Sequence, residues 1–258
     1  MTLVYFHEDF LEHYSAEPAA APGRLEPSLN ALRERYPVVQ PSKASEEDVL
    51  RVHTGRHLNR IARQGDLLYH TALVSLGSVK DASRTALEGE IAFALCRPPG
   101  HHAGRDYNWG FCYFNNVAAA VAEWLELDEA EKALIVDFDL HFGDGTEDIF
   151  KDNPRVTYWH GDTIDGASFT DELQAFLSQQ DADILAVSAG FDRHVDDWGG
   201  MLTTEDYGII GRLLGDYALR KCRGRVFAAL EGGYNRVAQA DGVMSFLEGL
   251  EEGREGIY

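Results

Sequence analysis

Three acids and one histidine lie close together in the segment A-L-I-V-D-F-D-L-H-F-G-D-G, residues 133–145. The segment begins with a continuous apolar run, which is typical of a strand buried on both faces. In extended chain, Asp137, Asp139 and His141 project to the same side, because side chains two residues apart share a face. Three such groups are too costly to bury alone, so a metal ion could compensate two and a hydrogen bond could hold the third. Taken alone, the segment could also be a solvated strand end followed by a Gly-rich turn.

Three further predicted strands end in polar side chains. Residues 91–96 precede R-P-P-G-H-H with His101 and His102, residues 184–187 precede S-A-G-F-D with Asp192, and residues 226–230 precede E-G-G-Y-N with Tyr234. In parallel α/β sheets, sites form outside the carboxyl ends of the strands. Together with the first segment, these strand ends predict an active site at one edge of one sheet.

Asp139, His141 and Asp192 make a set of two carboxylates and one imidazole. Three protein ligands with an open fourth position are typical of a catalytic Zn²⁺ site. Mixed nitrogen and oxygen ligands would also accept Fe²⁺, Co²⁺ or Mn²⁺. A metal ion here would lower the pKa of a bound water and polarise a carbonyl group.

The remaining polar groups suit proton transfer and charge stabilisation. The tandem imidazoles of His101 and His102 are the usual groups for proton transfer near pH 7. Asp137 and Asp144 could each accept the N–H of one histidine and so fix its tautomer. Tyr234 follows two glycines and can place a phenol O–H near an oxyanion. The set predicts metal-assisted hydrolysis of a carbonyl substrate.

Predicted strands and helices alternate along the chain with short connections. The strands are residues 2–6, 91–96, 134–136, 155–159, 183–187 and 225–230, and the helices are residues 27–35, 45–62, 71–88, 115–125, 146–150, 169–179, 203–221 and 237–250. Ser45 and Thr203 stand at capping-box-like helix starts. The alternation predicts an α/β fold, a three-layer α/β/α sandwich around a mostly parallel sheet. No repeat or linker is visible, so we expect one domain over residues 1–258.

The composition is that of a globular protein with a strongly acidic surface. The hydrophobic share is 45%, and the net charge is -20. This charge argues against nucleic acid or an anionic membrane as a partner and is compatible with a cationic small substrate. The three cysteines form no C-x-x-C pair, which favours a reducing compartment. With no visible signal peptide or membrane-spanning run, we expect a cytoplasmic protein.

Five segments, in this order, resemble the signature sequences of the zinc-dependent histone deacetylase and acetylpolyamine amidohydrolase superfamily: R-P-P-G-H-H-A, G-F-C-Y-F-N-N, V-D-F-D-L-H-x-G-D-G, S-A-G-F-D and E-G-G-Y-N. P-G-R-L-E at 22–26 and H-T-G-R-H-L at 53–58 resemble it more loosely. The resemblance implies a short bacterial- or archaeal-type member with the arginase–deacetylase fold. It also implies removal of acetyl, or other acyl, groups from acylated amines such as acetyl-lysine or acetylpolyamines.

The resemblance also implies a role for each residue of the site. Asp139, His141 and Asp192 are then the zinc ligands, His102 the general base and acid, His101 its electrostatic partner, Asp137 and Asp144 the carboxylates that orient His101 and His102, Tyr234 the donor to the scissile carbonyl, and Gly110 and Phe111 the lining of the substrate tunnel.

The chain departs from the family pattern after the D-x-D-x-H segment. Residues 151–170 are a shorter stretch than usual, and the second tunnel phenylalanine has no visible counterpart. We therefore expect a more open pocket, completed by Trp109, Trp159 or Trp198. The family's structural potassium ion binds backbone oxygens around D-x-D-x-H and a hydroxyl residue on the next strand. That position falls near Tyr158, which leaves K⁺ binding open.

Two other functions compete with a deacetylase. A relative that binds acylated ligands without turnover is disfavoured because His102, Tyr234 and the ligand set are all present. An arginase-like ureohydrolase with two Mn²⁺ ions needs a second ligand set with a G-G-D-H-type motif, and the sequence contains no such motif. For His53, His57 and the other histidines outside the motifs, ordinary structural or surface roles are expected.

Overall fold

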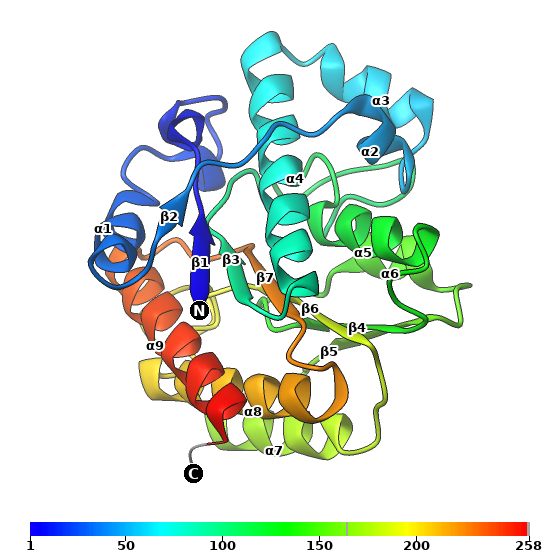
Figure 1. Ribbon diagram of the computed structural model, residues 1–258. Helices are drawn as coiled ribbons and strands as arrows, with labels where there is room; N and C mark the ends of the chain where they lie inside the picture. Colours follow the sequence, from blue (N-terminus) through cyan, green and yellow to red (C-terminus); the bar gives the residue numbers. More distant parts are fainter. Residues whose placement is uncertain (164, 257–258) are drawn as a thin grey trace.

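The strands with the most continuous apolar sequences form the centre of the sheet. The computed structural model describes residues 1–163 and 165–256 (Figure 1). Its strands are β1 (Thr2–Tyr5), β2 (Val38–Val39), β3 (Ile91–Ala94), β4 (Ala133–Asp137), β5 (Val156–His160), β6 (Ile184–Ala189) and β7 (Val226–Leu230). They form one seven-stranded sheet in the order β2-β1-β3-β7-β6-β4-β5, with every pairing parallel. Every residue of β3, β4, β6 and β7 is buried, as expected for strands covered on both faces.

Helices cover both faces of this sheet. The α-helices are α1 (Glu26–Arg35), α2 (Glu46–Leu50), α3 (Gly55–Ala62), α4 (Asp66–Leu87), α5 (Asn116–Glu126), α6 (Asp144–Phe150), α7 (Gly166–Leu177), α8 (Thr204–Lys221) and α9 (Arg236–Glu255). In Figure 1, α7, α8 and α9 lie on one side of the sheet, and α4 and α5 lie on the other. The expected three-layer α/β/α fold with a parallel sheet is therefore confirmed.

Local sequence signals set several helix ends. The capping boxes expected at Ser45 and Thr203 are both present, each closed by an aspartate three residues later. The single helix predicted over residues 45–62 is wrong: two helices are separated at Thr54, whose side chain accepts a hydrogen bond from the backbone of His57. The short edge strand β2 was not predicted, because two partly buried valines carry no periodic pattern. No helix in the described part of the chain is long and apolar enough to span a bilayer.

Candidate active site

The polar strand ends meet because their strands are neighbours. β3, β7, β6 and β4 are consecutive in the sheet, and all run in the same direction. Their carboxyl ends therefore bring together residues 97–102, 231–234, 190–192 and 137–144. This adjacency confirms the expectation that the strand ends followed by acids, histidines and Tyr234 share one edge of one sheet.

Asp139, His141 and Asp192 form one group whose ligand-type atoms all lie within 4.8 Å of one another. Nδ1 of His141 lies 3.2 Å from Oδ1 of Asp139 and 3.2 Å from Oδ2 of Asp192. β4 ends at Asp137, so Asp139 and His141 lie on the loop after the strand rather than on an extended face. The loop is held by Oδ1 of Asp139, which accepts a hydrogen bond from the backbone N–H of His141 at 2.9 Å.

The donor set of this group fits a divalent cation. Asp139 and Asp192 are fully buried, and the polar contact of Oδ2 of Asp192 in the described chain is the 3.2 Å ion pair with Nδ1 of His141. Two buried carboxylates this close need a positive charge between them. Their hydrogen bonds and charges raise the pKa of His141 to about 10, so a proton on this ring partly meets that need. A metal ion bound by the three residues would take the place of that proton.

Gly232 and Gly190 allow the carboxylates to approach the strand ends closely. A Cβ atom at Gly232 would lie 2.5 Å from Oδ2 of Asp192 and 2.6 Å from Oδ2 of Asp139. The backbone N–H of Gly232 instead donates a hydrogen bond to Oδ2 of Asp139 at 2.7 Å. A Cβ at Gly190 would likewise collide with Asp139. Only glycine is therefore compatible with this packing at both positions.

His102 is oriented by Asp144 at the start of α6. Its Nδ1 lies 2.7 Å from Oδ1 of Asp144, and because a carboxylate only accepts, Nδ1 carries the proton. Nε2 is then the basic nitrogen. Burial, followed by the neighbouring charge of His101, lowers the pKa of His102 to about 4. The ring is therefore neutral near pH 7 and able to accept a proton.

His101 has the opposite electrostatic environment. Its Nδ1 lies 3.0 Å from Oδ2 of Asp137. Burial opposes a charge on this ring, but the carboxylates of Asp139 and Asp137 outweigh it and raise the pKa of His101 well above its usual value. The two adjacent imidazoles, with ring centroids 4.0 Å apart, are therefore separated into one charged and one neutral group.

Tyr234 lies on the loop after β7, and its position is fixed through the backbone. The N–H groups of Tyr234 and Asn235 donate to Oδ2 of Asp197 at 2.7 and 2.6 Å. The guanidinium of Arg24 donates to the carbonyl of Gly233 at 2.8 Å and lies 5.2 Å from the Tyr234 ring centroid. Burial raises the pKa of Tyr234, so the phenol keeps its proton and can donate it in a hydrogen bond.

Sequence reasoning did not assign roles to Arg24, Asp197, Glu231 or Tyr107. Glu231 is fully buried and accepts hydrogen bonds from the backbone N–H groups of Gly100 and His101, at 2.6 and 3.2 Å. The hydroxyl of Tyr107 lies 3.1 Å from Oδ2 of Asp144. Arg24 and Glu231 lie inside the quoted motifs P-G-R-L-E and E-G-G-Y-N, which could have indicated them. Asp197 and Tyr107 gave no such signal.

Tryptophans flank the site on two sides. Trp109 packs on His102 with centroids 3.9 Å apart, and its Nε1–H donates to Oδ2 of Asp144 at 2.9 Å. Trp198 stacks on Tyr234 with centroids 3.9 Å apart and an interplanar angle of 19°. Trp109 and Trp198 are 52% and 53% exposed, so each presents an aromatic surface to solvent beside the site.

The expectation for Trp159 is wrong. This side chain is buried under α7, where it stacks on Phe176 at 5.5 Å and contacts Phe169 at 5.6 Å. β5 is an edge strand, and Trp159 is its best buried residue, so it fills the core rather than lining a pocket.

Gly110 lies against His102, and Phe111 lies beside Tyr234. Gly110 has φ +57°, and a Cβ there would collide with the ring of His102. Phe111 also has a positive φ, 65°, which is uncommon for a residue with a side chain. Its ring lies 6.1 Å from that of Tyr234 in an edge-to-face arrangement. Gly110 therefore packs against His102, and the ring of Phe111 lies beside that of Tyr234.

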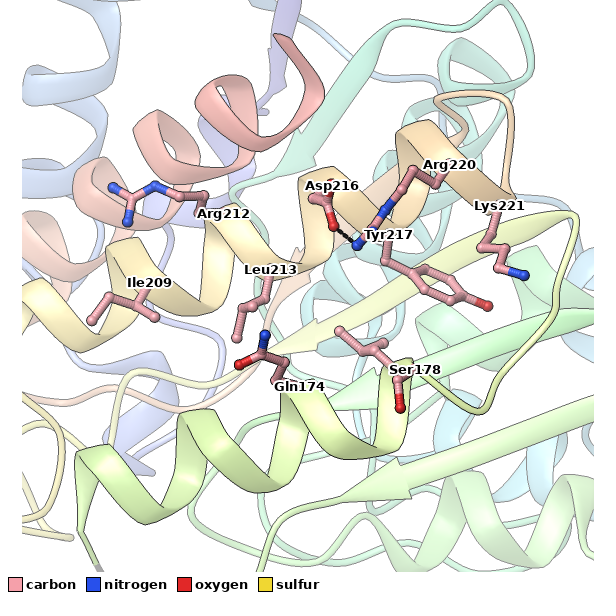
Figure 2. A pocket seen from close by; sticks show the side chains of 10 residues that line it. Gln174, Ser178, Ile209, Arg212, Leu213, Asp216, Tyr217, Arg220 and Lys221 are labelled. Carbon is pink, nitrogen blue, oxygen red and sulfur yellow. Dashed lines mark ion pairs between the residues drawn. The ribbon is translucent and has the colours of Figure 1, made fainter. Parts of the chain in front are cut away.

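A separate pocket of about 630 Å³ lies between α7 and α8 (Figure 2). Its lining includes Gln174, Leu213 and Tyr217, and an Asp216–Arg220 ion pair lies along it. None of the residues that line it comes from the strand ends that carry the acids and histidines. The two sites are therefore distinct.

Comparisons with known proteins agree with this geometry. The family model described as the histone deacetylase domain matches residues 19–169 and 161–250. The chain belongs to the histone deacetylase family. The two matched segments overlap at residues 161–169, inside the stretch 151–170 where the sequence departs from the family pattern. Family membership confirms the expected enzyme class, a hydrolase that acts on acetylated amides.

The chain covers different shares of the relatives it resembles. It is 32% identical over 294 residues to a probable deacetylase of Archaeoglobus fulgidus, with 91% of this chain and 82% of that protein covered. It is 30% identical to polyamine deacetylase HDAC10 of Mus musculus, with coverage of 89% and 44%. The solved structure of the HDA15 HD domain matches with a TM-score of 0.82 at 25% identity, covering 98% of this chain and 90% of that one. The expected arginase–deacetylase fold is thereby confirmed.

Proposed function

We propose that this histone deacetylase family member is a Zn²⁺-dependent amidohydrolase that removes an acetyl or other acyl group from an amine. One observation carries the proposal. The group Asp139–His141–Asp192, the His102–Asp144 pair and the Tyr234 loop all lie at the carboxyl ends of adjacent strands. This combination offers metal ligands, a neutral base and a phenol donor to one acyl group.

Asp139, His141 and Asp192 would hold the metal ion. When bound, Zn²⁺ supplies polarisation of the acyl carbonyl and acidification of water. Fe²⁺ or Co²⁺ suits the same nitrogen and oxygen donors. The mouse relative is named a polyamine deacetylase and the archaeal relative a probable deacetylase, which supports this chemistry.

His102 moves the proton in both halves of the reaction. Its Nε2 accepts a proton from the attacking water, while Nδ1–H stays hydrogen-bonded to Asp144. Nε2 then gives this proton to the amine nitrogen as the carbon–nitrogen bond breaks, leaving a carboxylic acid and an amine, which become a carboxylate and an ammonium ion by proton transfer. His101, charged beside Asp137, stabilises the negative charge that builds up nearby and keeps His102 neutral at the outset.

Tyr234 donates its phenol O–H to the acyl oxygen as negative charge develops there. Asp197 accepts the backbone N–H of Tyr234 and Arg24 donates to the carbonyl of Gly233, and these two hydrogen bonds hold the Tyr234 loop.

We propose a cationic acylated amine, such as an acetylpolyamine or acetyl-lysine, as the substrate. The net charge of -20 attracts cations. The exposed faces of Trp109 and Trp198 can contact an aliphatic chain or an ammonium group. Phe111 and Gly110 supply the rest of the wall.

The competing functions are less well supported. Among the described residues, the second group that could hold a metal is His101–Cys112–Glu231, whose cysteine and single carboxylate differ from the second set of Asp and His ligands that a two-metal ureohydrolase needs. A relative that only binds ligands would not need the His102–Asp144 pair or a fixed Tyr234 loop.

The test combines metal content with turnover. Purified protein is loaded with Zn²⁺, its metal content is measured, and acetylpolyamines, acetyl-lysine peptides and longer acyl-lysines are assayed. We expect about one ion per chain and hydrolysis of at least one substrate. His102→Ala should lose activity, whereas His70→Ala on α4, whose ring pairs with Asp9, should not. The absence of turnover by the loaded wild type on every substrate would refute the enzyme, and two Mn²⁺ ions per chain would favour the ureohydrolase.

A further inference from the structure

Arg193 is a buried cation directly after the metal-ligand candidate Asp192. It is 2% exposed, and its guanidinium donates to backbone carbonyls. Nε donates to the carbonyl of Asp139 at 3.0 Å, and Nη2 donates to that of Gly161 at 2.5 Å. Nη1 lies 3.4 Å from the carbonyl of Thr163, and the ring of Phe169 lies 5.1 Å from the guanidinium carbon. Nη2 also lies 3.1 Å from Nε2 of His160, and Nη1 lies 3.8 Å from Sδ of Met201. Within the described chain, the oxygen atoms that accept from Arg193 are therefore backbone carbonyls rather than a carboxylate.

Side chains of β5 contact the carbonyl oxygen of Asp139 and the carboxylate of Asp137. Nε2 of His160 lies 2.9 Å from the carbonyl oxygen of Asp139 and 3.1 Å from Nη2 of Arg193, so this ring contacts both partners of the Arg193–Asp139 hydrogen bond. The hydroxyl of Tyr158 donates to Oδ2 of Asp137 at 3.0 Å and accepts the backbone N–H of Gly143 at 2.8 Å. Protein groups thus already contact the carbonyl oxygen of Asp139 and Oδ2 of Asp137.

This arrangement does not fit the potassium ion that the family resemblance implies. A potassium ion would need the backbone oxygens of the D-x-D-x-H segment and a hydroxyl on β5. The carbonyl of Asp139 accepts a hydrogen bond from Arg193 and lies 2.9 Å from Nε2 of His160, and the hydroxyl of Tyr158 is held between Asp137 and Gly143. A Cβ at Gly143 would lie 2.7 Å from this hydroxyl, so little space is left beside it.

We propose that the guanidinium of Arg193 is a built-in cation that fixes the carbonyl of Asp139, so that the metal site keeps its geometry without a monovalent ion. A guanidinium keeps its charge at all accessible pH values and directs several N–H donors in fixed directions. Arg193 links the loop after β4 to the loop after β5, because it donates to the carbonyls of Asp139 and Gly161. It also directly follows the ligand candidate Asp192 in the sequence. It is therefore a positioning residue for Asp139 and Asp192.

The proposal uses the metal ligands of the proposed function, but its test needs no substrate. Metal-free protein is titrated with Co²⁺, and both the visible absorption of bound Co²⁺ and the thermal midpoint are recorded in K⁺, Na⁺ and choline salts of equal ionic strength. For the wild type, we expect Co²⁺ affinity to agree within about 2-fold among the three salts. A rise of 5-fold or more in K⁺ alone would overturn the proposal.

Variants provide the second arm. Arg193→Met keeps the length of the side chain and removes the charge and donors, and it should weaken Co²⁺ binding at least 10-fold and change the absorption spectrum. Arg193→Lys should restore part of the affinity. The matched control is Arg155→Met, because Arg155 also donates to three carbonyls, of Glu131, Leu125 and Ala130, but at the opposite end of β4 and β5.

The control variant should bind Co²⁺ like the wild type even where its thermal midpoint falls. Co²⁺ affinity and spectrum unchanged in Arg193→Met would contradict the proposal. If that variant does not fold, the comparison of the three salts on the wild type still decides it. Failure of every acyl substrate would refute the proposed function and leave these binding results valid.

Discussion

The Nδ1 atom of His102 lies 2.7 Å from Oδ1 of Asp144, and the same carboxylate accepts the indole N–H of Trp109. One acid thus fixes both the proposed base and a wall of the substrate site. Asp144→Asn would allow the amide to donate to Nδ1 and favour the wrong tautomer of His102. We expect kcat to fall by roughly 100-fold with little change in bound metal. Asp148→Asn on the same helix is the control, because Asp148 pairs with Lys151 and the backbone of Arg105. An equal loss in both variants would contradict the role of Asp144.

The phenol of Tyr234 is proposed to stabilise the developing oxyanion. Tyr234→Phe keeps the stacking on Trp198 and removes only the donor. Loss of one such donor costs about 10²–10³ in kcat, so kcat should fall by that factor while KM changes little. Tyr217→Phe, whose hydroxyl is buried in α8 away from the site, should keep wild-type kinetics. A Tyr234→Phe variant with wild-type kcat would exclude this role.

Trp198 is expected to contact the substrate chain. Trp198→Ala removes an exposed aromatic face that stacks on Tyr234 at 3.9 Å, and kcat/KM should fall by roughly 10-fold, mainly through KM. Trp198→Phe should recover most of the loss. The measurement is a kinetic comparison of a cationic acetylpolyamine with a neutral acetylated amine of the same length. If cation binding by the ring contributes, the cationic substrate loses more, and equal losses would indicate an apolar contact only.

His53 should make the fold sensitive to acid. Its Nδ1 lies 2.9 Å from the carbonyl of Gly104, and its Nε2 accepts the backbone N–H of Asn115 at 2.9 Å. This ring must be neutral, and burial, followed by the charge of His57, lowers its pKa to about 3. The unfolded chain binds this proton below about pH 6.5, so the stability contribution is present above that pH and is lost as pH falls toward 3.

Urea unfolding at pH 7 and pH 5 measures this effect. The wild type should lose roughly 2 kcal/mol of unfolding free energy through His53 between these pH values. His53→Gln should be less stable at pH 7 but should show a smaller decrease on acidification. Identical pH dependence in the two proteins would show that His53 does not carry the effect.

The sequence alone determined which segments form the sheet and which of them carry chemistry. Continuous apolar runs predicted β3, β4, β6 and β7, because burial on both faces requires such runs. The glycine and polar residues that follow each run predicted where the site residues lie. The capping boxes at Ser45 and Thr203 were likewise readable, since a cap involves residues only three apart.

Only the tertiary structure decided how these ends meet. Strand order depends on packing between segments far apart in the chain, so sequence periodicity could not make β3, β7, β6 and β4 neighbours. Beyond Asp137 the backbone leaves the strand, and the alternation of faces no longer says where Asp139 and His141 point. Trp159 and Trp198 show the same limit, because one fills the core beneath α7 and the other stacks on Tyr234. The contact between Arg193 and the carbonyl of Asp139 joins residues 54 positions apart, and no local pattern predicts it.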